Sequence, residues 1–306
     1  MKQLWVEKYR PSTMDEYVFV DARQREQVAE WIQEKSIPHL LFSGGPGTGK
    51  TTLARMLVKE LDIDEYDIMQ INASNETKVE TMRDKVLGFA QTMPFGRMKI
   101  VLLDEADYLS PSSQALLRNA LETYEETVRF IFTCNLPHKI IPAIHSRCQG
   151  FHIAKTDHTE FTARVATVLV TEGVEFDIDT LDSYVKATYP DLRKCLNLVQ
   201  QNSNSGALSN PRDSEKSVGD WRLDTVELFK TGKIREARGL LCSQARPEEM
   251  EEIFRWLYDN LELWGKQPEQ QDEAIKVIRT GLVNHTVCAD PEINLSATLI
   301  ELGQIQ

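Results

Sequence analysis

The chain has 306 residues, of which 41% are hydrophobic and 27% charged, and its formal net charge is −12. These fractions are ordinary for a folded protein, and the length suits two or three domains. No apolar run approaches the roughly 20 residues of a membrane span, and the amino terminus lacks the apolar stretch of a secretion signal, so we expect a soluble, intracellular protein. The negative charge argues against general affinity for nucleic acid unless basic residues gather locally.

The cysteines are scattered and include no Cys-x-x-Cys pair, so the sequence indicates neither a disulfide framework nor a zinc ribbon. We expect reduced, partly buried thiols. They are Cys134, Cys148, Cys195, Cys242 and Cys288.

Strand and helix signals alternate from about residue 37 to residue 153. Short apolar runs predict strands at 38–43, 68–71, 99–103, 128–133 and 151–153. Apolar residues at helical spacing predict helices at 51–61, 78–91 and 110–123. Strands that alternate with helices predict an α/β fold, in which a parallel sheet has helices on both faces.

Beyond residue 153 the strand signals fade, and helices are predicted at 159–172, 180–187 and 191–201. Residues 200–219 are rich in Asn, Ser, Gly and Pro, which is typical of a linker, and the chain from 221 to 302 again has a helical pattern. We therefore expect four parts. They are an α/β nucleotide-binding domain at 1–153, a helical lid at 154–203, a linker at 204–219 and an all-α domain at 220–306.

The segment Gly44-Gly45-Pro46-Gly47-Thr48-Gly49-Lys50-Thr51 fits the pattern G-x-x-x-x-G-K-[ST], between a predicted strand and a predicted helix. The glycines let the backbone curl so that its N–H groups point at phosphates, and the helix aims its positive end at the same anion. Lys50 can bind the β- and γ-phosphates, and the Thr51 hydroxyl can ligate Mg²⁺. We predict that this loop binds ATP with Mg²⁺, with further contacts from Gly47, Thr48, Gly49 and Thr52. The alternative is a glycine-rich turn without a ligand.

A second motif, Ile100-Val101-Leu102-Leu103-Asp104-Glu105, places two carboxylates at the carboxyl end of a buried strand, where α/β sheets bind ligands. Asp104 can hold Mg²⁺ through its water shell, and Glu105 can polarise the attacking water. Asp107 completes an Asp-Glu-Ala-Asp sequence. We interpret it as a solvated or capping residue and do not infer a helicase from it.

These motifs resemble those of the AAA+ family, and within it the clamp-loader ATPase subunits. The segment Trp5-Val6-Glu7-Lys8-Tyr9-Arg10-Pro11 is similar to the amino-terminal signature of replication factor C small subunits. Ser146-Arg147-Cys148 is similar to the Ser-Arg-Cys motif of clamp loaders, and Asn72–Glu76 to the segment that enters their DNA-facing helix. The resemblance covers residues 5–200 and extends to the T-even-phage sliding-clamp loader. It implies an AAA+ P-loop NTPase sheet with a helical lid, followed by a helical collar for oligomerisation.

The resemblance also implies contacts with the nucleotide. Val6, Glu7, Lys8 and Tyr9 would lie against the adenine and ribose, with Val18 nearby, although the residues alone indicate only a polar arm.

Three further residues would act at the γ-phosphate. Asn135 would orient the attacking water or read the γ-phosphate, and Arg193 of the lid would contact the γ-phosphate. Arg147 would be an arginine finger that reaches the nucleotide of a neighbouring subunit. From their own patterns Asn135 can equally be a turn residue, Arg193 a partner of Asp191 and Arg147 a solvated surface group.

For DNA, the resemblance implies that Thr77, Lys78 and Arg83, at and along the predicted helix 78–91, follow the duplex backbone. Arg97 and Lys99 in the next loop would add to a basic stripe, which a ring of several copies would multiply. The alternative is a solvated helix face.

The implied function is that of an ATP-driven switch in DNA replication. Copies of this chain, with a distinct second loader subunit, would form a ring-like spiral that opens a sliding clamp and loads it onto primer–template DNA. ATP hydrolysis, stimulated by DNA and clamp, would trigger release. One alternative is another AAA+ DNA-remodelling motor or a helicase-type ATPase, and a second is a ring member that binds nucleotide without hydrolysing it.

Overall fold

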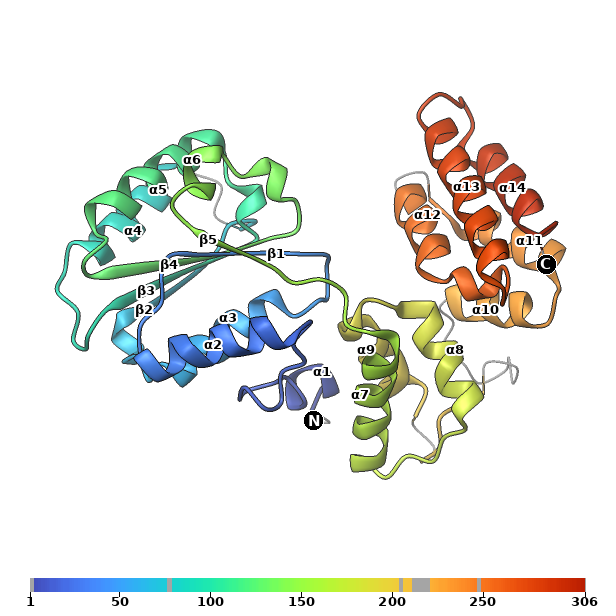
Figure 1. Cartoon of the computed structure of the whole chain (residues 1–306), viewed down its shortest axis with the longest axis horizontal. Helices are drawn as coiled ribbons and strands as arrows, with labels where there is room; N and C mark the ends of the chain where they lie inside the picture. Colours follow the sequence, from blue (N-terminus) through green and yellow to red (C-terminus); the bar gives the residue numbers. More distant parts are fainter. Residues whose placement is uncertain (1–2, 76–78, 204–205, 211–220, 247–248, 306) are drawn as a thin grey trace. The chain divides into compact units, whose positions relative to one another are not determined.

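Five parallel strands form one sheet in the order β2-β3-β4-β1-β5 (Figure 1). The structure is a computed structural model, and it describes the chain except residues 1–2, 76–78, 204–205, 211–220, 247–248 and 306. It comprises two compact units, an α/β unit of residues 9–157 and a helical unit that joins the residues up to Lys8 with those from His158 onward. The predicted fold class, a parallel α/β sheet followed by helices, is confirmed. No helix among the described residues is long and apolar enough to cross a membrane.

All five predicted strands are present. Their bounds are β1 Leu40–Ser43, β2 Ile68–Asn72, β3 Lys99–Asp104, β4 Val128–Cys134 and β5 Gln149–His152. Because β3, β4 and β1 are neighbours, the chain segments that follow them leave the same edge of the sheet side by side. We call this edge the carboxyl edge, and the opposite edge, where the strands begin, the amino edge.

Helices cover both faces of the sheet (Figure 1). On one face lie α2 (Ala22–Glu34) and α3 (Lys50–Glu60), and on the other lie α4 (Val79–Ala90), α5 (Pro111–Thr123) and the short α6 (Pro142–His145). The predicted helices at 51–61, 78–91 and 110–123 therefore correspond to α3, α4 and α5.

Successive side chains of the strands point alternately into two apolar cores, one on each face of the sheet. In β3, Val101 and Leu103 belong to the core under α4 and α5, whereas Ile100 and Leu102 belong to the core under α2 and α3. Successive side chains of a strand point to opposite faces, so a strand buried on both faces must be apolar throughout. This requirement explains why the strands could be recognised as continuous apolar runs.

Helix α2 was not predicted from the sequence. Asp21 caps it, accepting a hydrogen bond of 2.8 Å from the backbone N–H of Gln24, but only Val28 and Trp31 are buried along its length. Its apolar stripe is therefore narrower than the pattern that identifies an amphipathic helix. The Asp21 cap was the available signal.

The helical unit begins with three helices that match the predictions at 159–172, 180–187 and 191–201. They are α7 (His158–Thr171), α8 (Ile178–Thr188) and α9 (Leu192–Gln201). The short amino-terminal helix α1 (Trp5–Lys8) packs against α9. The Gln200 side chain accepts from the N–H of Trp5 and donates to the carbonyl of Gln3, both at 3.0 Å. Most of the predicted linker at 204–219 lies outside the described residues.

From Trp221 onward the described residues form further helices, as the pattern from 221 to 302 predicted. They are α10 (Trp221–Lys230), α11 (Ile234–Gln244), α12 (Met250–Asp259), the short 3-10 helix η5 (Leu261–Leu263), α13 (Pro268–His285) and α14 (Pro291–Leu302).

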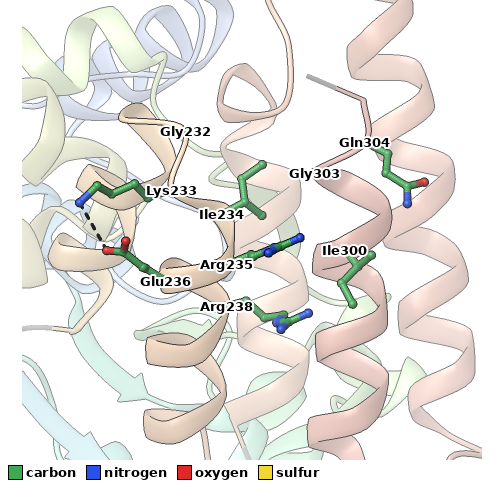
Figure 2. Close-up of a pocket in the computed structure, with 9 residues that line it drawn as sticks. All are labelled: Gly232, Lys233, Ile234, Arg235, Glu236, Arg238, Ile300, Gly303 and Gln304. Carbon is green, nitrogen blue, oxygen red and sulfur yellow. Dashed lines mark hydrogen bonds and ion pairs between the residues drawn. The ribbon is translucent and has the colours of Figure 1, made fainter.

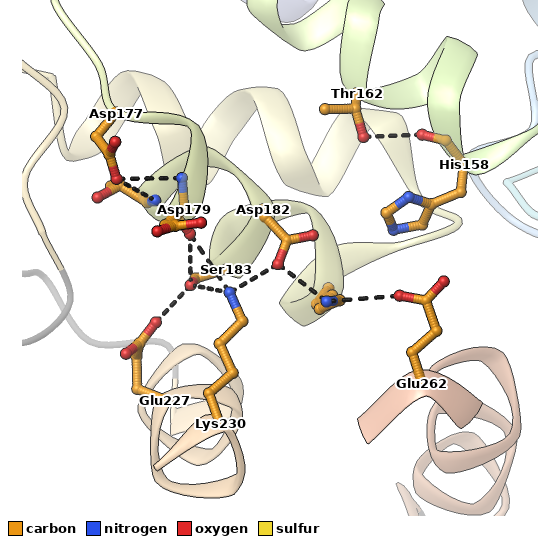
Figure 3. A network of polar contacts seen from close by, with 11 residues as sticks. His158, Thr162, Asp177, Asp179, Asp182, Ser183, Glu227, Lys230 and Glu262 are labelled. Carbon is orange, nitrogen blue, oxygen red and sulfur yellow. Dashed lines mark hydrogen bonds and ion pairs between the residues drawn. The ribbon is translucent and has the colours of Figure 1, made fainter. Parts of the chain in front are cut away.

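A polar network joins α8 to α10 (Figure 3). The Asp182 carboxylate pairs with Lys230 at 2.7 Å and with Lys186 at 2.9 Å, and the Ser183 hydroxyl donates to Glu227. Burial opposes the ionisation of Asp182, but the two ammonium groups outweigh it and lower the pKa of the carboxyl. The network therefore fastens α8 to α10 with paired, partly buried charges.

An open groove of about 610 Å³ lies between the start of α11 and the end of α14 (Figure 2). Its lining includes Lys233, Arg235 and Arg238, together with the apolar Ile234 and Ile300. All the residues that line the groove belong to the helical unit.

A histidine at the start of the sheet gives the α/β unit a pH-dependent stability. The His39 Nδ1 atom accepts a hydrogen bond of 3.2 Å from the N–H of Phe130 in β4, so the neutral ring is the form that fits. Burial, followed by the positive charge of Arg129, lowers the pKa of His39 to about 4. The unfolded chain binds this proton near pH 6.5, so stability is lost as the pH falls from about 6.5 towards 4.

We predict that His39→Asn flattens this dependence, because the Asn oxygen can accept the same N–H without titrating. Urea unfolding at pH 7, 6 and 5 should show a smaller loss of free energy of unfolding for His39→Asn than for the parent. Parallel losses in the two proteins would contradict the assignment.

Candidate nucleotide-binding site

The loop between β1 and α3 depends on glycine at two positions. A Cβ atom on Gly44 would lie 2.2 Å from the carbonyl oxygen of Ile153, so no larger residue fits there. Gly49 has φ +94°, in the left-handed region, and is the N-cap of α3. A glycine cap has no side chain to occupy the first N–H groups of the helix, which leaves them available to an anion.

Lys50, the first residue of α3, is turned into this loop. Its side chain is buried, and the Nζ atom donates to the carbonyl oxygens of Gly44 at 3.0 Å and Gly45 at 2.5 Å. The loop therefore encloses a fixed positive charge beside the N-terminus of α3, where both would attract phosphate.

One carboxylate oxygen collects hydroxyl groups from two neighbouring elements. Asp104 Oδ1, at the end of β3, accepts from the Thr51 hydroxyl of α3 at 2.7 Å and also from the Thr133 hydroxyl of β4. The Thr133 hydroxyl in turn accepts the N–H of Glu105 at 3.1 Å. Hydroxyl and carboxylate oxygens are the ligands that Mg²⁺ prefers, so Thr51 and Asp104 suit the predicted metal contact.

Thr133 was not among the residues predicted for the site. It is 1% exposed, and it is a polar residue that directly follows the buried apolar residues Phe130, Ile131 and Phe132 of β4. A buried hydroxyl needs a partner, so a polar residue at this end of a core strand was the signal that could have identified it.

Glu105 has an unusual backbone conformation, with φ 57° and ψ 43°. The left-handed region costs a residue other than glycine about 1–2 kcal/mol, and such residues gather at functional sites. Its N–H is held by Thr133, and its carbonyl oxygen accepts the N–H of Tyr108 at 3.0 Å. The strained turn thus has hydrogen bonds on both sides and fixes the direction in which Glu105 leaves the strand.

The interpretation of Asp107 as a solvated or capping residue is wrong. Asp107 is buried, and its Oδ2 atom accepts the N–H groups of Asn135 at 3.3 Å and Leu136 at 3.1 Å. The reason is that the backbone after β4 has no ladder partner and needs an acceptor. Asp107 therefore ties the turn after Glu105 to the segment that contains Asn135.

Arg147 lies at the other edge of the sheet. It precedes β5 by two residues, at the amino edge, where the N–H of Gln149 donates to the carbonyl of His39 at 2.7 Å. Its guanidinium donates to Glu122 near the end of α5, with Nε at 2.7 Å, and to the carbonyl of Ala143 at 2.8 Å. The phosphate loop and Asp104 lie at the carboxyl edge, so Arg147 is not brought together with them.

The remaining nucleotide residues divide between the two units. Tyr9 and Val18 are half-buried in the α/β unit. The other four belong to the helical unit: Val6, Glu7, Lys8 and Arg193.

Within the helical unit, the Lys8 ammonium pairs with Glu172 at 2.7 Å, next to the α1–α9 contact. Arg193 is exposed near the start of α9, and Asp191 caps that helix by accepting the N–H of Lys194 at 3.1 Å.

Only some of the residues predicted to contact DNA are among those that the structure describes. Thr77 and Lys78 lie outside the described residues, and Arg83 and Arg97 are exposed on α4 and in the loop that follows it. Lys99 was wrongly included in the basic stripe. It is the first residue of β3, 2% exposed, and its ammonium donates to the carbonyl of Phe89 at 2.9 Å.

Comparison with known proteins identifies the family. Residues 40–156 match the model of the ATPase family associated with various cellular activities (AAA). The replication factor C small subunit of Methanococcus vannielii is 32% identical over 322 residues that span all of both chains. The chain belongs to the replication factor C small-subunit family. The family member from Sulfolobus acidocaldarius is 34% identical over 98% of this chain and 95% of its own.

Solved structures extend the likeness to a wider fold. The Thermotoga maritima RuvB Holliday junction branch migration motor superposes with a TM-score of 0.55 over 81% of this chain and 80% of its own, at 16% identity. At this identity the likeness shows a shared fold and no more. The replication factor C relatives, twice as similar in sequence, decide the family.

We predict that Thr133→Val impairs hydrolysis more than binding. Valine keeps the shape of threonine but leaves Asp104 and the Glu105 N–H without their shared hydroxyl, and a hydrogen bond to a charged group contributes about 1.5–3 kcal/mol. Single-turnover ATP hydrolysis should fall roughly ten- to a hundredfold, whereas ATP affinity should change by only a few-fold. Thr133→Ser, which restores the hydroxyl, should recover most of the rate. Equal losses in both variants would count against this role.

Proposed function

We propose that this chain is an ATP-hydrolysing subunit of a sliding-clamp loader. Copies of it, with a distinct second subunit, assemble into a spiral that opens a clamp and places it on primer–template DNA during replication. ATP binding stabilises the spiral and hydrolysis releases it. The family membership supports this function, and the arrangement of the site supports the way in which ATP would be used.

The α/β unit supplies the groups that hydrolysis requires. Lys50 and the first N–H groups of α3 would bind the β- and γ-phosphates, while Thr51 and, through water, Asp104 would hold Mg²⁺. When bound, Mg²⁺ would neutralise charge on the phosphates. Glu105, whose strained turn fixes its direction, would polarise the attacking water, and Asn135 would orient it.

The single observation that carries the proposal is the position of Arg147. The strands of the sheet separate it from the phosphate loop, and β1 alone, with four residues, has a length of roughly 13 Å. A guanidinium is suited to the charge that develops on a transferred phosphoryl group. Placed at the amino edge, Arg147 would serve the nucleotide of a neighbouring subunit, so hydrolysis would depend on assembly.

The main alternative is a DNA-remodelling motor, for which the RuvB fold offers an analogy. The family favours the loader, because the relatives that match over the full length are replication factor C small subunits. A loader should show no strand separation or branch migration by the assembled complex, whereas a motor should.

We predict that Arg147→Ala keeps ATP affinity but lowers the ATPase rate that DNA and clamp stimulate by about 10³-fold, the effect of losing an arginine finger. Arg25→Ala is the matched control, because Arg25 is another exposed arginine of this unit, paired with Asp15 at 2.9 Å. Its rate should stay at the parent level.

A mixing experiment tests the action between subunits. Arg147→Ala and Lys50→Ala subunits are each expected to be inactive, yet together they can form an interface in which Lys50 and Arg147 are both intact. The mixture should regain a measurable fraction of the parent rate. Undiminished turnover of Arg147→Ala alone, or no recovery on mixing, would overturn the assignment.

An exposed apolar cluster at the amino edge is the proposed contact with the clamp. Met93 and Phe95 are 78% and 80% exposed, and Tyr66 lies against Phe95 with ring centroids 5.8 Å apart. The loop is anchored by the buried Asp67, which accepts the N–H groups of Phe95 at 3.0 Å and Gly96 at 2.7 Å. Grouped exposed apolar side chains on a fixed loop favour a protein–protein contact.

We predict that Met93→Ser combined with Phe95→Ser lowers the clamp-dependent stimulation of ATP hydrolysis about tenfold, while DNA-dependent stimulation is retained. Val170→Ser, at a residue of α7 that is 68% exposed, is the control for loss of an exposed apolar side chain. Equal clamp stimulation of the parent and the double variant would rule out this surface.

The other assignments remain part of the proposal. Residues 154–203 would form the lid and 220–306 the collar, with 204–219 between them. Arg83 and Arg97, together with Thr77 and Lys78, would follow the DNA backbone, and the repetition of a few cations around the ring would compensate for the acidity of each chain.

A further inference from the structure

The Tyr17 hydroxyl is a buried polar group that the packing of the α/β unit does not explain. The residue is 8% exposed, and its hydroxyl is buried without a hydrogen-bond partner among the residues that the structure describes. The ring packs edge-on against Phe19, with centroids 4.9 Å apart, and belongs to the apolar core under α2 and α3. Phenylalanine would fill the same space, so packing does not explain the hydroxyl.

The hydroxyl lies against the phosphate loop. A Cβ atom built on Gly49 would be 3.3 Å from the Tyr17 oxygen and 3.3 Å from the ring carbon Cε2. Gly49 is the N-cap of α3, the residue directly before Lys50. The one unpaired hydroxyl of this core, among the described residues, therefore lies beside the N-cap of α3.

A buried hydroxyl without a partner destabilises a protein, and such a group in a native structure requires an explanation. Burial also raises the pKa of Tyr17 above its ordinary value, so the group keeps its proton and remains a donor. A donor at the N-cap of a phosphate-binding helix matches the chemistry of an anionic, oxygen-rich ligand.

We propose that the Tyr17 hydroxyl donates a hydrogen bond to an oxygen of the bound nucleoside triphosphate. The inference rests on the proposed ATP site and adds a contact that the motif residues do not include. Phosphate and ribose oxygens are both acceptors of this kind. The unpaired hydroxyl lowers the free energy of unfolding of the nucleotide-free protein. It gains a partner when the nucleotide binds, so it raises the affinity for nucleotide.

Tyr17→Phe tests both effects, because it removes only the oxygen. Calorimetric titration of the full-length chain with ATP and Mg²⁺ should show affinity reduced about tenfold, as expected for loss of a hydrogen bond to a charged acceptor. Without nucleotide, the urea midpoint of Tyr17→Phe should equal or exceed that of the parent. Tyr258→Phe, which removes an exposed hydroxyl from α12, should change neither quantity.

Titration with inorganic tripolyphosphate distinguishes the two acceptors. A matching loss for tripolyphosphate assigns the contact to a phosphate oxygen, and a loss confined to ATP assigns it to the ribose. ATP affinity of Tyr17→Phe within twofold of the parent would overturn the inference, as would a lower urea midpoint of the free protein. Lys50→Ala separates this failure from that of the site itself, because unchanged ATP binding by Lys50→Ala would refute the phosphate site as a whole.

Discussion

The carboxylate of Asp104 is the contact on which the site is built. Its Oδ1 atom accepts hydrogen bonds from the Thr51 hydroxyl of α3, the helix after β1, and from the Thr133 hydroxyl of β4, so one oxygen joins β3 to β4 and to α3. The strand order makes this possible, because β4 lies between β1 and β3. The same Thr133 hydroxyl holds the N–H of Glu105, so the residues assigned to metal binding and to water activation share one support. A shift of β3, β4 or α3 would therefore disturb these contacts.

The residues proposed for catalysis and those proposed for assembly lie at opposite edges of the sheet. Buried and hydrogen-bonded polar groups occupy the carboxyl edge, where Lys50 and Asp107 are fixed by backbone atoms. At the amino edge the groups proposed for assembly are exposed: Arg147 is held by Glu122 and Phe95 lies in solvent, while the buried Asp67 holds the backbone of that loop. A buried polar group has a fixed position, because leaving its hydrogen bonds unmade costs free energy. An exposed group loses little when it exchanges a partner in the same chain for another molecule. The first edge suits catalysis and the second suits assembly.

The sequence was sufficient to predict the five strands and the phosphate loop, because an apolar run and a glycine spacing are both local patterns. It was not sufficient for contacts between distant segments. Thr133 and Asp107 gain their roles only when β4 lies beside β3. The Lys99 ammonium donates to Phe89 and Thr92 of the preceding helix and loop. Helix α2 escaped prediction for a different reason, since its narrow apolar stripe carries little periodic signal.

Fold alone does not distinguish this chain from other ATPases of its type. RuvB shares the architecture at 16% identity, and a phosphate loop beside two carboxylates is expected of any such hydrolase. A difference in function must therefore reside in what surrounds that common centre. In this chain the candidates are Arg147, which lies at the opposite edge of the sheet from the phosphate loop, the apolar loop that Asp67 holds, and the Tyr17 hydroxyl beside Gly49. Each of these groups is exposed or lacks a hydrogen-bond partner in the α/β unit alone. Such groups are expected where a neighbouring subunit, a partner protein or a ligand binds.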